Sequence, residues 1–353
     1  MLKYLVPFLE AFFFSVFFLF ATISFSHRFF LEKHKSSRHI HLKRGKNIPR
    51  IGGIAMVLAF NLAIIFDKNL VISPELYGFM LGTGIIFAVG FWDDIKEIFW
   101  KVQLFFQVAV AVLVFIMGVR VYYITNPFTG GIIRFDSSLG TIFSVLMVIF
   151  WIVVVINAIN WADGIDGLSG GISLIAGTTI FFLSLRPEVN QPPIAIVCAI
   201  LTGVFLGFLI FNFYPAKIMA GTCGAMFMGF SLSVLAIFSG TKIATALLVL
   251  IIPLIDFLWV IGERFRNNRS LFQPDMNHLH YKLMELGWSQ RKIVFSYWIF
   301  TVIVAFIALN TRVFGKSVTL FLTVFLTVIF LVYINKKILW LKGRRTEKYQ
   351  VKD

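Results

Sequence analysis

Long apolar runs separated by short polar segments dominate this chain. Such runs predict membrane-spanning helices, because a hydrocarbon core about 30 Å thick requires about 20 apolar residues per helix. Helices are expected rather than barrel strands, since the runs are far longer than the roughly ten residues that a transmembrane strand needs. Eleven spans are predicted, at residues 4–26, 51–66, 75–92, 102–118, 141–158, 169–186, 194–214, 219–239, 243–262, 293–310 and 317–335.

The composition agrees with this pattern. Of the 353 residues, 59% are hydrophobic and 14% are charged, whereas soluble domains carry roughly a quarter charged residues. We therefore expect an all-α, polytopic membrane protein that forms one integral membrane domain over residues 1–353, with a basic cytoplasmic tail at 336–353. Its two cysteines, Cys198 and Cys223, lie in apolar runs and indicate neither a disulfide framework nor a thiolate metal site.

Lysine and arginine fall unevenly between the two predicted faces. If the N-terminus lies outside, the inner segments are 27–50, 93–101, 159–168, 212–218, 263–292 and the tail from 336. These segments hold 24 of the 32 lysines and arginines, so the positive-inside rule predicts an outside N-terminus and a cytoplasmic C-terminus. The net charge of +15 follows from this topology and from attraction to anionic lipid headgroups, and no nucleic-acid partner is predicted.

Most acidic side chains gather at the predicted cytoplasmic ends of the spans, where charges are costly and usually functional. Asp93 and Asp94 are adjacent, and neighbouring carboxylates repel each other unless a cation lies close. Mg²⁺, Lys96 or Lys101 is therefore expected beside them. Three glutamates are interpreted instead as ion-pairing partners among basic loops: Glu97, Glu263 and Glu285.

The polar segment NAINWADGIDGLSGG, residues 157–171, directly follows a strongly apolar run. Its polar members recur every third residue: Asn157, Asn160, Asp163 and Asp166. This spacing does not share one face of a straight α-helix, and Gly164 and Gly167 are expected to break the helix so that the set points into one cleft. Such oxygen ligands suit Mg²⁺, with waters and phosphate completing its shell. The alternative is that DGIDG is only turn chemistry at a helix end.

Two further inner segments carry chemistry. Residues 212–230 contain a glycine-interrupted helix start, where backbone N–H groups could meet an anion. The loop 263–283 carries arginine and histidine donors that are expected to face a diphosphate: Arg264, Arg266, Arg269, His278 and His280. Zinc is not favoured at these histidines, because no third ligand of the usual type stands at close spacing. A solvated basic loop is the alternative.

Five motifs together resemble the polyprenyl-phosphate N-acetylhexosamine-1-phosphate transferases. They are IPRIGGIAM (48–56), GFWDDIKEI (90–98), NAINWADGIDGLSGG (157–171), FNFYPAKI (211–218) and PDMNHLHYKL (274–283). The resemblance covers nearly the whole chain in the expected order. It implies transfer of a sugar-1-phosphate from a UDP-N-acetylhexosamine, chiefly UDP-GlcNAc, to undecaprenyl phosphate, with release of UMP and with Mg²⁺, or alternatively Mn²⁺, as the cofactor.

The resemblance also implies roles for particular residues and a place in the cell. Asp93 and Asp94 would act at the reacting lipid phosphate, and Asn160 and Asp163 would bind the metal. The substrate-binding residues would be Asn157, Asp166, Lys101, Arg264, Arg266, His278 and His280. The enzyme would sit in the inner (cytoplasmic) membrane among its lipids, with a homodimer left open. It would catalyse the first membrane step of cell-wall or lipopolysaccharide synthesis.

Three residues depart from the family pattern. After PAKI the family usually reads FMGDTGS, whereas this chain reads MAGTCGA, so Thr222 replaces a metal-binding Asp and Ala225 replaces a hydroxyl. Tyr281 stands where a third histidine is usual. The alternatives are a UDP-MurNAc-pentapeptide phosphotransferase, which IPRIGG and the histidine spacing disfavour, and a catalytically weakened binding or scaffold relative. A transporter is disfavoured because the acidic residues gather at one face.

Overall fold

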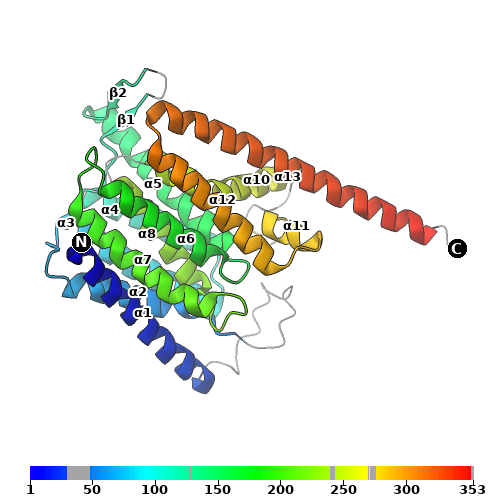
Figure 1. Cartoon of the computed structure of the whole chain (residues 1–353), viewed down its shortest axis with the longest axis horizontal. Helices are drawn as coiled ribbons and strands as arrows, with labels where there is room; N and C mark the ends of the chain where they lie inside the picture. The colour runs from blue at the N-terminus through cyan, green and yellow to red at the C-terminus, as the bar shows by residue number, and fades with distance from the viewer. Residues whose placement is uncertain (30–47, 127–128, 239–242, 269, 271–275, 351–353) are drawn as a thin grey trace.

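The computed structural model is a bundle of helices with one small hairpin, and it describes residues 1–29, 48–126, 129–238, 243–268, 270 and 276–350 (Figure 1). Helix α1 (Leu2–Phe29) lies along one edge of the bundle and α13 (Val313–Gln350) along the opposite edge. Helix α1 begins at the end of the bundle opposite to the one where α13 finishes. The all-α, polytopic architecture expected from the hydropathy pattern is therefore confirmed.

Every predicted span coincides with a helix or, at residues 243–262, with a bent pair of helices. The remaining helices are α2 (Gly52–Phe66), α3 (Pro74–Lys96), α4 (Trp100–Ile116), α5 (Ser138–Ala162), α6 (Leu168–Ser184), α7 (Pro192–Asn212), α8 (Gly221–Phe238), α9 (Ile243–Val249), α10 (Ile251–Arg266), α11 (Leu279–Glu285) and α12 (Gln290–Asn310). Among the described residues, seven helices are long and apolar enough to cross a membrane, and the bent pair α9 and α10 makes an eighth. Helices α2, α4 and α6 are apolar but shorter, so the number of crossings stays a prediction.

Local sequence explains where several helices begin. The hydroxyls of Ser73, Ser137 and Ser289 accept backbone N–H groups at the starts of α3, α5 and α12, as N-cap residues do. The 76° bend between α9 and α10 lies beside Pro253, which has no N–H to donate to the carbonyl of Val249 four residues earlier.

Helix α8 runs through the core, and 89% of its apolar window is buried. It packs on α2, α3 and α5, and glycines make the first two contacts very close. A Cβ atom on Gly90 would lie 2.4 Å from Cα of Cys223, and one on Gly53 would lie 2.3 Å from the backbone nitrogen of Gly224. The N–H of Gly52 also donates to the carbonyl of Met219 at 2.9 Å. The start of α8 is thus wedged between α2 and α3.

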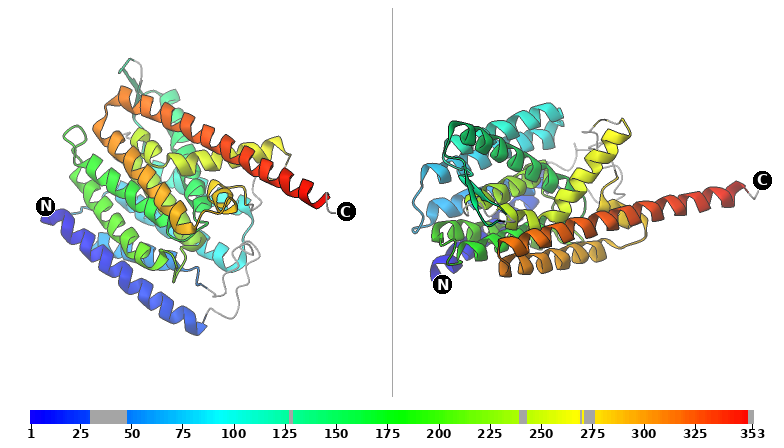
Figure 2. Two further views of the ribbon diagram at one scale, coloured as in Figure 1. Left: turned by 45° about the vertical axis from the view of Figure 1, so that its right-hand side comes forward. Right: turned by 90° about the horizontal axis from the view of Figure 1, so that it is seen from above.

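The hydropathy pattern did not reveal three features. Strands β1 (Tyr123–Thr125) and β2 (Ile132–Arg134) form an antiparallel hairpin in which Tyr123 faces Arg134. The short helix α11 begins within the segment 263–283 that was interpreted as a loop. The predicted tail from residue 336 begins inside α13, whose last turns reach beyond the rest of the bundle (Figure 2).

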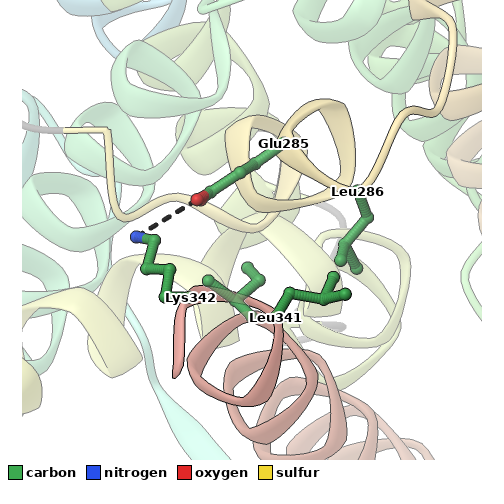
Figure 3. Close-up of a pocket in the computed structure, with 5 residues that line it drawn as sticks. Glu285, Leu286, Leu341 and Lys342 are labelled. Carbon is green, nitrogen blue, oxygen red and sulfur yellow. Dashed lines mark ion pairs between the residues drawn. The ribbon is translucent and has the colours of Figure 1, made fainter. Parts of the chain in front are cut away.

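Helix α13 contacts α10 and α11 through polar pairs. The Glu285 carboxylate of α11 lies 3.1 Å from the Lys342 ammonium of α13 (Figure 3). In addition, the Asn335 amide donates to the Glu263 carboxylate of α10 at 3.3 Å, and Lys282 lies 3.3 Å from the same carboxylate. The interpretation of Glu263 and Glu285 as ion-pairing residues is confirmed. The pair of Glu285 with Lys342 is exposed and contributes at most about 1 kcal/mol.

Candidate active site

Polar side chains from several helix ends converge at one end of the bundle. The end of α3 meets the start of α8, and the link between α5 and α6 meets both the segment after α7 and helix α11. The Asp163 carboxylate lies close enough to Asp94 and Asp166 for their negative charges to act on it. Aspartates that are far apart in the sequence therefore form one acidic cluster.

The two adjacent aspartates of α3 are satisfied by hydrogen-bond donors. Both oxygens of Asp94 accept backbone N–H groups at the start of α8, from Thr222 at 2.7 Å and from Cys223 at 3.0 Å. Asp93 is buried and accepts the Thr222 hydroxyl at 2.9 Å and the N–H of Ile98 at 3.0 Å. The anion expected at this helix start is thus the carboxylate of Asp94, placed where free N–H groups and the helix dipole favour negative charge.

Lys101, one of the cations expected beside this pair, lies elsewhere. Its side chain is exposed, and its ammonium group is 5.6 Å from the ring centre of Trp100. Such a position over an aromatic ring is a cation–π contact. Among the described residues, backbone N–H groups and the Thr222 hydroxyl donate to Asp93 and Asp94, and the cation whose charge acts on Asp94 is Arg50.

The predicted helix break at DGIDG is confirmed. Helix α5 ends at Ala162, α6 begins at Leu168, and Gly167 has a φ of 80° that favours glycine. Asn212, a buried residue that the sequence did not single out, fixes this turn because its side-chain oxygen accepts the N–H of Gly167 at 3.0 Å. Asp166 is also buried and accepts the N–H of Ala216 at 3.1 Å. The turn is therefore tied to the segment that follows α7.

Asp163 and Asn160 are the residues best suited to a metal ion. Burial raises the pKa of the Asp163 carboxyl from its ordinary value of 3.8 to about 7, and one of its oxygens accepts the Ser169 hydroxyl. The Asn160 amide is half-buried and has no hydrogen-bond partner among the described residues. A carboxylate that the surrounding protein makes costly to ionise is one that a bound cation would stabilise.

The chain alone does not supply a complete metal shell in the described residues. They contain no group of three or more His, Cys, Asp or Glu side chains that could hold a metal ion. Mg²⁺ usually takes one or two carboxylates and obtains its other oxygens from waters and substrate phosphates. Asp163 and Asn160 are the described residues whose oxygens could contribute to such a shell.

Asn157 is turned toward a neighbouring helix. Its amide donates to the Gln107 side chain of α4 at 2.7 Å and to the carbonyl of Val153 at 2.8 Å. Gln107 is buried, so this pair satisfies polar groups inside the helix bundle. The structure brings Asp163 and Asp166 together but gives Asn157 a partner on α4.

The histidine segment is held by an acidic residue of α10. Nδ1 of His278 lies 2.9 Å from one oxygen of Asp256, and the other oxygen accepts the N–H of Leu279 at 2.8 Å. His278 and Asp256 are both buried. No motif pairs Asp256 with His278, because the two residues are 22 positions apart in the sequence.

His280 and Tyr281 join the histidine segment to the DGIDG turn. The Tyr281 hydroxyl donates to the carbonyl of Gly164 at 3.4 Å. A Cβ atom on Gly164 would lie 2.2 Å from Nε2 of His280. His280 is buried, and this burial together with neighbouring His278 lowers its pKa from 6.5 to about 3, so the ring is neutral.

The two predicted arginines of α10 differ in position. Arg264 is buried with its guanidinium 4.7 Å from the ring centre of Trp161, and the same indole lies 5.3 Å from the His278 ring. Arg266 is exposed in the last turn of α10, and Arg269 lies outside the described residues. The structure therefore brings Arg264 and His278 to one aromatic side chain at the end of α5.

Arg50 is a candidate functional residue that the sequence reasoning did not assign. Its positive charge acts on both Asp163 and Asp94, and its buried Nε has no hydrogen-bond partner among the described residues. Arg50 lies in the motif IPRIGGIAM, between its proline and its two glycines. This position is the sequence feature that could have identified Arg50 as functional.

Comparison with known proteins decides the family. Residues 76–240 match the model of Glycosyl transferase family 4. A protein of Bacillus subtilis (strain 168), named probable undecaprenyl-phosphate N-acetylglucosaminyl 1-phosphate transferase, is 30% identical over 306 residues, which are 85% of this chain and 81% of the relative. The chain belongs to glycosyl transferase family 4.

Other relatives of this family 4 chain carry two kinds of name. Decaprenyl-phosphate N-acetylglucosaminephosphotransferase of Mycobacterium leprae (strain TN) is 32% identical over 303 residues, 77% of this chain and 75% of the relative. Phospho-N-acetylmuramoyl-pentapeptide-transferase of Thermoanaerobacter sp. (strain X514) is 30% identical over 285 residues, 76% of this chain and 85% of the relative. The family resemblance found in the motifs is thereby confirmed.

Proposed function

We propose that this family 4 chain transfers N-acetylglucosamine-1-phosphate from UDP-GlcNAc to undecaprenyl phosphate and releases UMP. The names of the Bacillus and Mycobacterium relatives support the sugar and the polyprenyl-phosphate acceptor. The observation that carries the proposal is the convergence of the aspartate cluster and the His278 segment at one end of an apolar helix bundle. A lipid phosphate anchored in the membrane and a soluble nucleotide would meet at such an end.

The reaction is a displacement at phosphorus. An oxygen of the lipid phosphate bonds to the β-phosphorus of UDP-GlcNAc, and the bond from that phosphorus to the bridging oxygen breaks, so that UMP leaves with this oxygen. Both substrates are anions, and positioning with charge neutralisation supplies most of the catalysis in such transfers. Arg50 would neutralise charge beside the aspartates, and Arg264 and His278 would bind the diphosphate. Asp93 and Asp94 would lie at the lipid phosphate.

We further propose Mg²⁺ as the cofactor, with Mn²⁺ able to replace it, held by Asp163 and Asn160 and by phosphate oxygens. The ion would neutralise charge on the diphosphate and orient it for attack. If so, Asp163→Asn should raise the Mg²⁺ concentration required for half-maximal UMP release by about 10-fold or more. An unchanged Mg²⁺ requirement in a well-folded Asp163→Asn variant would remove Asp163 from the metal site.

The location follows from the same reasoning. We propose that the site faces the cytoplasm in the inner membrane, because 24 of the 32 lysines and arginines lie in segments predicted to face that side and UDP-sugars are made in the cytoplasm. The enzyme would then begin assembly of a cell-wall or lipopolysaccharide polymer on the lipid carrier. Surrounding lipids would be its other partners, and a homodimer remains compatible with the fold.

A substrate panel tests the proposal and its main alternative. Purified protein is incubated with undecaprenyl phosphate, Mg²⁺ and either UDP-GlcNAc, UDP-GalNAc or UDP-MurNAc-pentapeptide, and UMP release is measured. We expect UMP release with UDP-GlcNAc. Release only with UDP-MurNAc-pentapeptide would favour the second activity, for which the Thermoanaerobacter relative is named. Tight UDP-GlcNAc binding without turnover would favour the weakened scaffold that Thr222, Ala225 and Tyr281 suggest.

A further inference from the structure

The two histidines of the segment 278–280 differ sharply in what their rings contact. Nε2 of His280 is sealed inside the protein without a hydrogen-bond partner among the described residues, and it lies against Gly164. The His278 side chain retains 7% exposure, and its Nε2 is not among the buried polar atoms that lack a hydrogen-bond partner in the described residues. Only His278 therefore combines a fixed nitrogen with one that a ligand can reach.

Asp256 fixes His278 from two directions. One carboxylate oxygen lies 2.9 Å from the ring nitrogen Nδ1, and the other accepts the N–H of Leu279 at 2.8 Å. These contacts hold the ring and also the backbone that starts α11. A carboxylate is an acceptor, so Nδ1 must carry the hydrogen, and the opposite nitrogen is then left for a ligand.

Aromatic neighbours limit rotation of the ring. The Trp161 ring meets the His278 ring edge-on, with 5.3 Å between ring centres. The His280 ring stacks on the His278 ring at 5.6 Å, with only 8° between the ring planes. The guanidinium of Arg264 covers Trp161 at 4.7 Å. His278 and the buried Arg264 thus lie on the same indole, that of Trp161. Their nitrogens are suited to bind the oxygens of a diphosphate.

From this geometry we propose that Asp256 is a positioning residue that holds His278 in the Nδ1–H form and presents Nε2 to the diphosphate of the nucleotide sugar. His280 acts as a packing residue that seats the segment on the DGIDG turn. The inference rests on the proposed function for the identity of the ligand, but the arrangement of Asp256 and His278 does not depend on that ligand.

The protonation of His278 is tested in the unmodified protein. The histidine rings are labelled with ¹⁵N, nitrogen–proton correlations are recorded above neutral pH in detergent micelles, and His278→Gln assigns the His278 signal. We expect hydrogen on Nδ1, in the neutral ring or in the imidazolium. A His278 ring with hydrogen on Nε2 alone overturns the inference, whatever the activity of the preparation.

A double-mutant cycle tests whether Asp256 acts through His278. We expect Asp256→Asn to lower kcat/KM for UMP release by about 10- to 100-fold, the range seen when a partner that orients a functional histidine is removed. We expect the double variant Asp256→Asn, His278→Gln to be no slower than His278→Gln alone, because coupled residues are not additive. The matched control is Asp136→Asn, an exposed aspartate after β2 whose change should leave kcat/KM unaltered.

The two proposals fail in different ways. The positioning role is wrong if the losses in kcat/KM from the two single substitutions multiply in the double variant, or if Asp256→Asn has a normal kcat/KM. In either case, UMP release from UDP-GlcNAc still supports the proposed function. The opposite outcome is also possible to recognise. If no UDP-sugar yields UMP, the proposed function fails. The pairing of Asp256 with His278 still stands if Nδ1 of His278 carries hydrogen in the parent and loses it in Asp256→Asn. The measurement on the unmodified protein decides the pairing even if Asp256→Asn does not fold.

Discussion

Thr222 links the two adjacent aspartates to the start of α8. Its N–H donates to Asp94 and its hydroxyl donates to Asp93. The family pattern usually has a metal-binding carboxylate here, and the sequence alone suggested only a weaker metal site. The structure adds that the hydroxyl compensates for the missing charge by acting as a donor, which a carboxylate at the same position could not do.

Changing Thr222 to Asp tests this exchange of roles. Without Mg²⁺, Thr222→Asp should lower the free energy of unfolding by about 1–3 kcal/mol, because Asp93 loses a donor and gains a negative neighbour. Mg²⁺ should restore the stability and support UMP release at a lower concentration than in the parent. Thermal unfolding and UMP release are measured across a Mg²⁺ titration. Thr222→Val controls for loss of the hydroxyl alone, and a Thr222→Asp variant that does not respond to Mg²⁺ would contradict the prediction.

His280 predicts a particular sensitivity to acid. Its pKa is about 3 in the folded protein against an ordinary value of 6.5, so the unfolded chain binds a proton first as the pH falls. The stability that comes from keeping this ring neutral is present above pH 6.5 and declines by about 1.4 kcal/mol per pH unit below it. We expect unfolding free energies of His280→Gln to fall less steeply with pH than those of the parent. Parallel slopes for the two proteins would show that His280 does not titrate in this way.

At the scale of elements, the breaks marked by glycine were predictable, whereas the bend between α9 and α10 and the contacts between elements were not. The glycines of DGIDG marked the end of α5, and the glycine after PAKI marked the start of α8. The pairing of Asp256 with His278 could not be predicted, because the two residues are 22 positions apart and the chain turns between them. Spacing in the sequence then does not indicate which side chains meet. The β1–β2 hairpin was hidden in a linker that hydropathy treats as a loop.

Gly164 tests the contact between the DGIDG turn and α11. A methyl group there would lie 2.2 Å from Nε2 of His280 and 2.7 Å from the Tyr281 hydroxyl, and the buried His280 ring has little room to move. We expect Gly164→Ala to displace the histidine segment and to lower kcat/KM for UMP release by about 10-fold or more, a scale typical of small misplacements in active sites.

Gly84 of α3 provides the matched control, because a Cβ atom there would meet nothing within 4 Å. Gly84→Ala should leave activity intact and stabilise the helix by about 0.5–1 kcal/mol. Thermal unfolding and UMP release of the two variants are compared. Equal activities would show that the turn and α11 move independently of each other.

For the whole molecule, hydropathy located the spans because burial in lipid demands continuous apolar helices. It could not show that α13 continues as a helix to Gln350, since charged residues after 336 end the apolar signal without ending the helix. Nor could it show that α8 is the buried centre while α1 and α13 lie at opposite edges, because the mean hydropathy of the buried α8, 1.7, is lower than the 2.1 and 2.5 of the edge helices. Packing partners, rather than hydropathy, decide this arrangement.

The orientation of the bundle is tested by labelling single cysteines in sealed cells. Asn267, after α10, and Asn190, before α7, are both exposed, and they lie at ends predicted to face opposite sides of the membrane. Because 24 of the 32 lysines and arginines lie in segments predicted to share the side of Asn267, Asn190→Cys should react with an impermeant maleimide from outside. Asn267→Cys should react only after the membrane is opened. The parent, whose Cys198 and Cys223 are buried, gives the background. Labelling of Asn267→Cys from outside would reverse the orientation and would place the acidic cluster away from the cytoplasmic UDP-sugars.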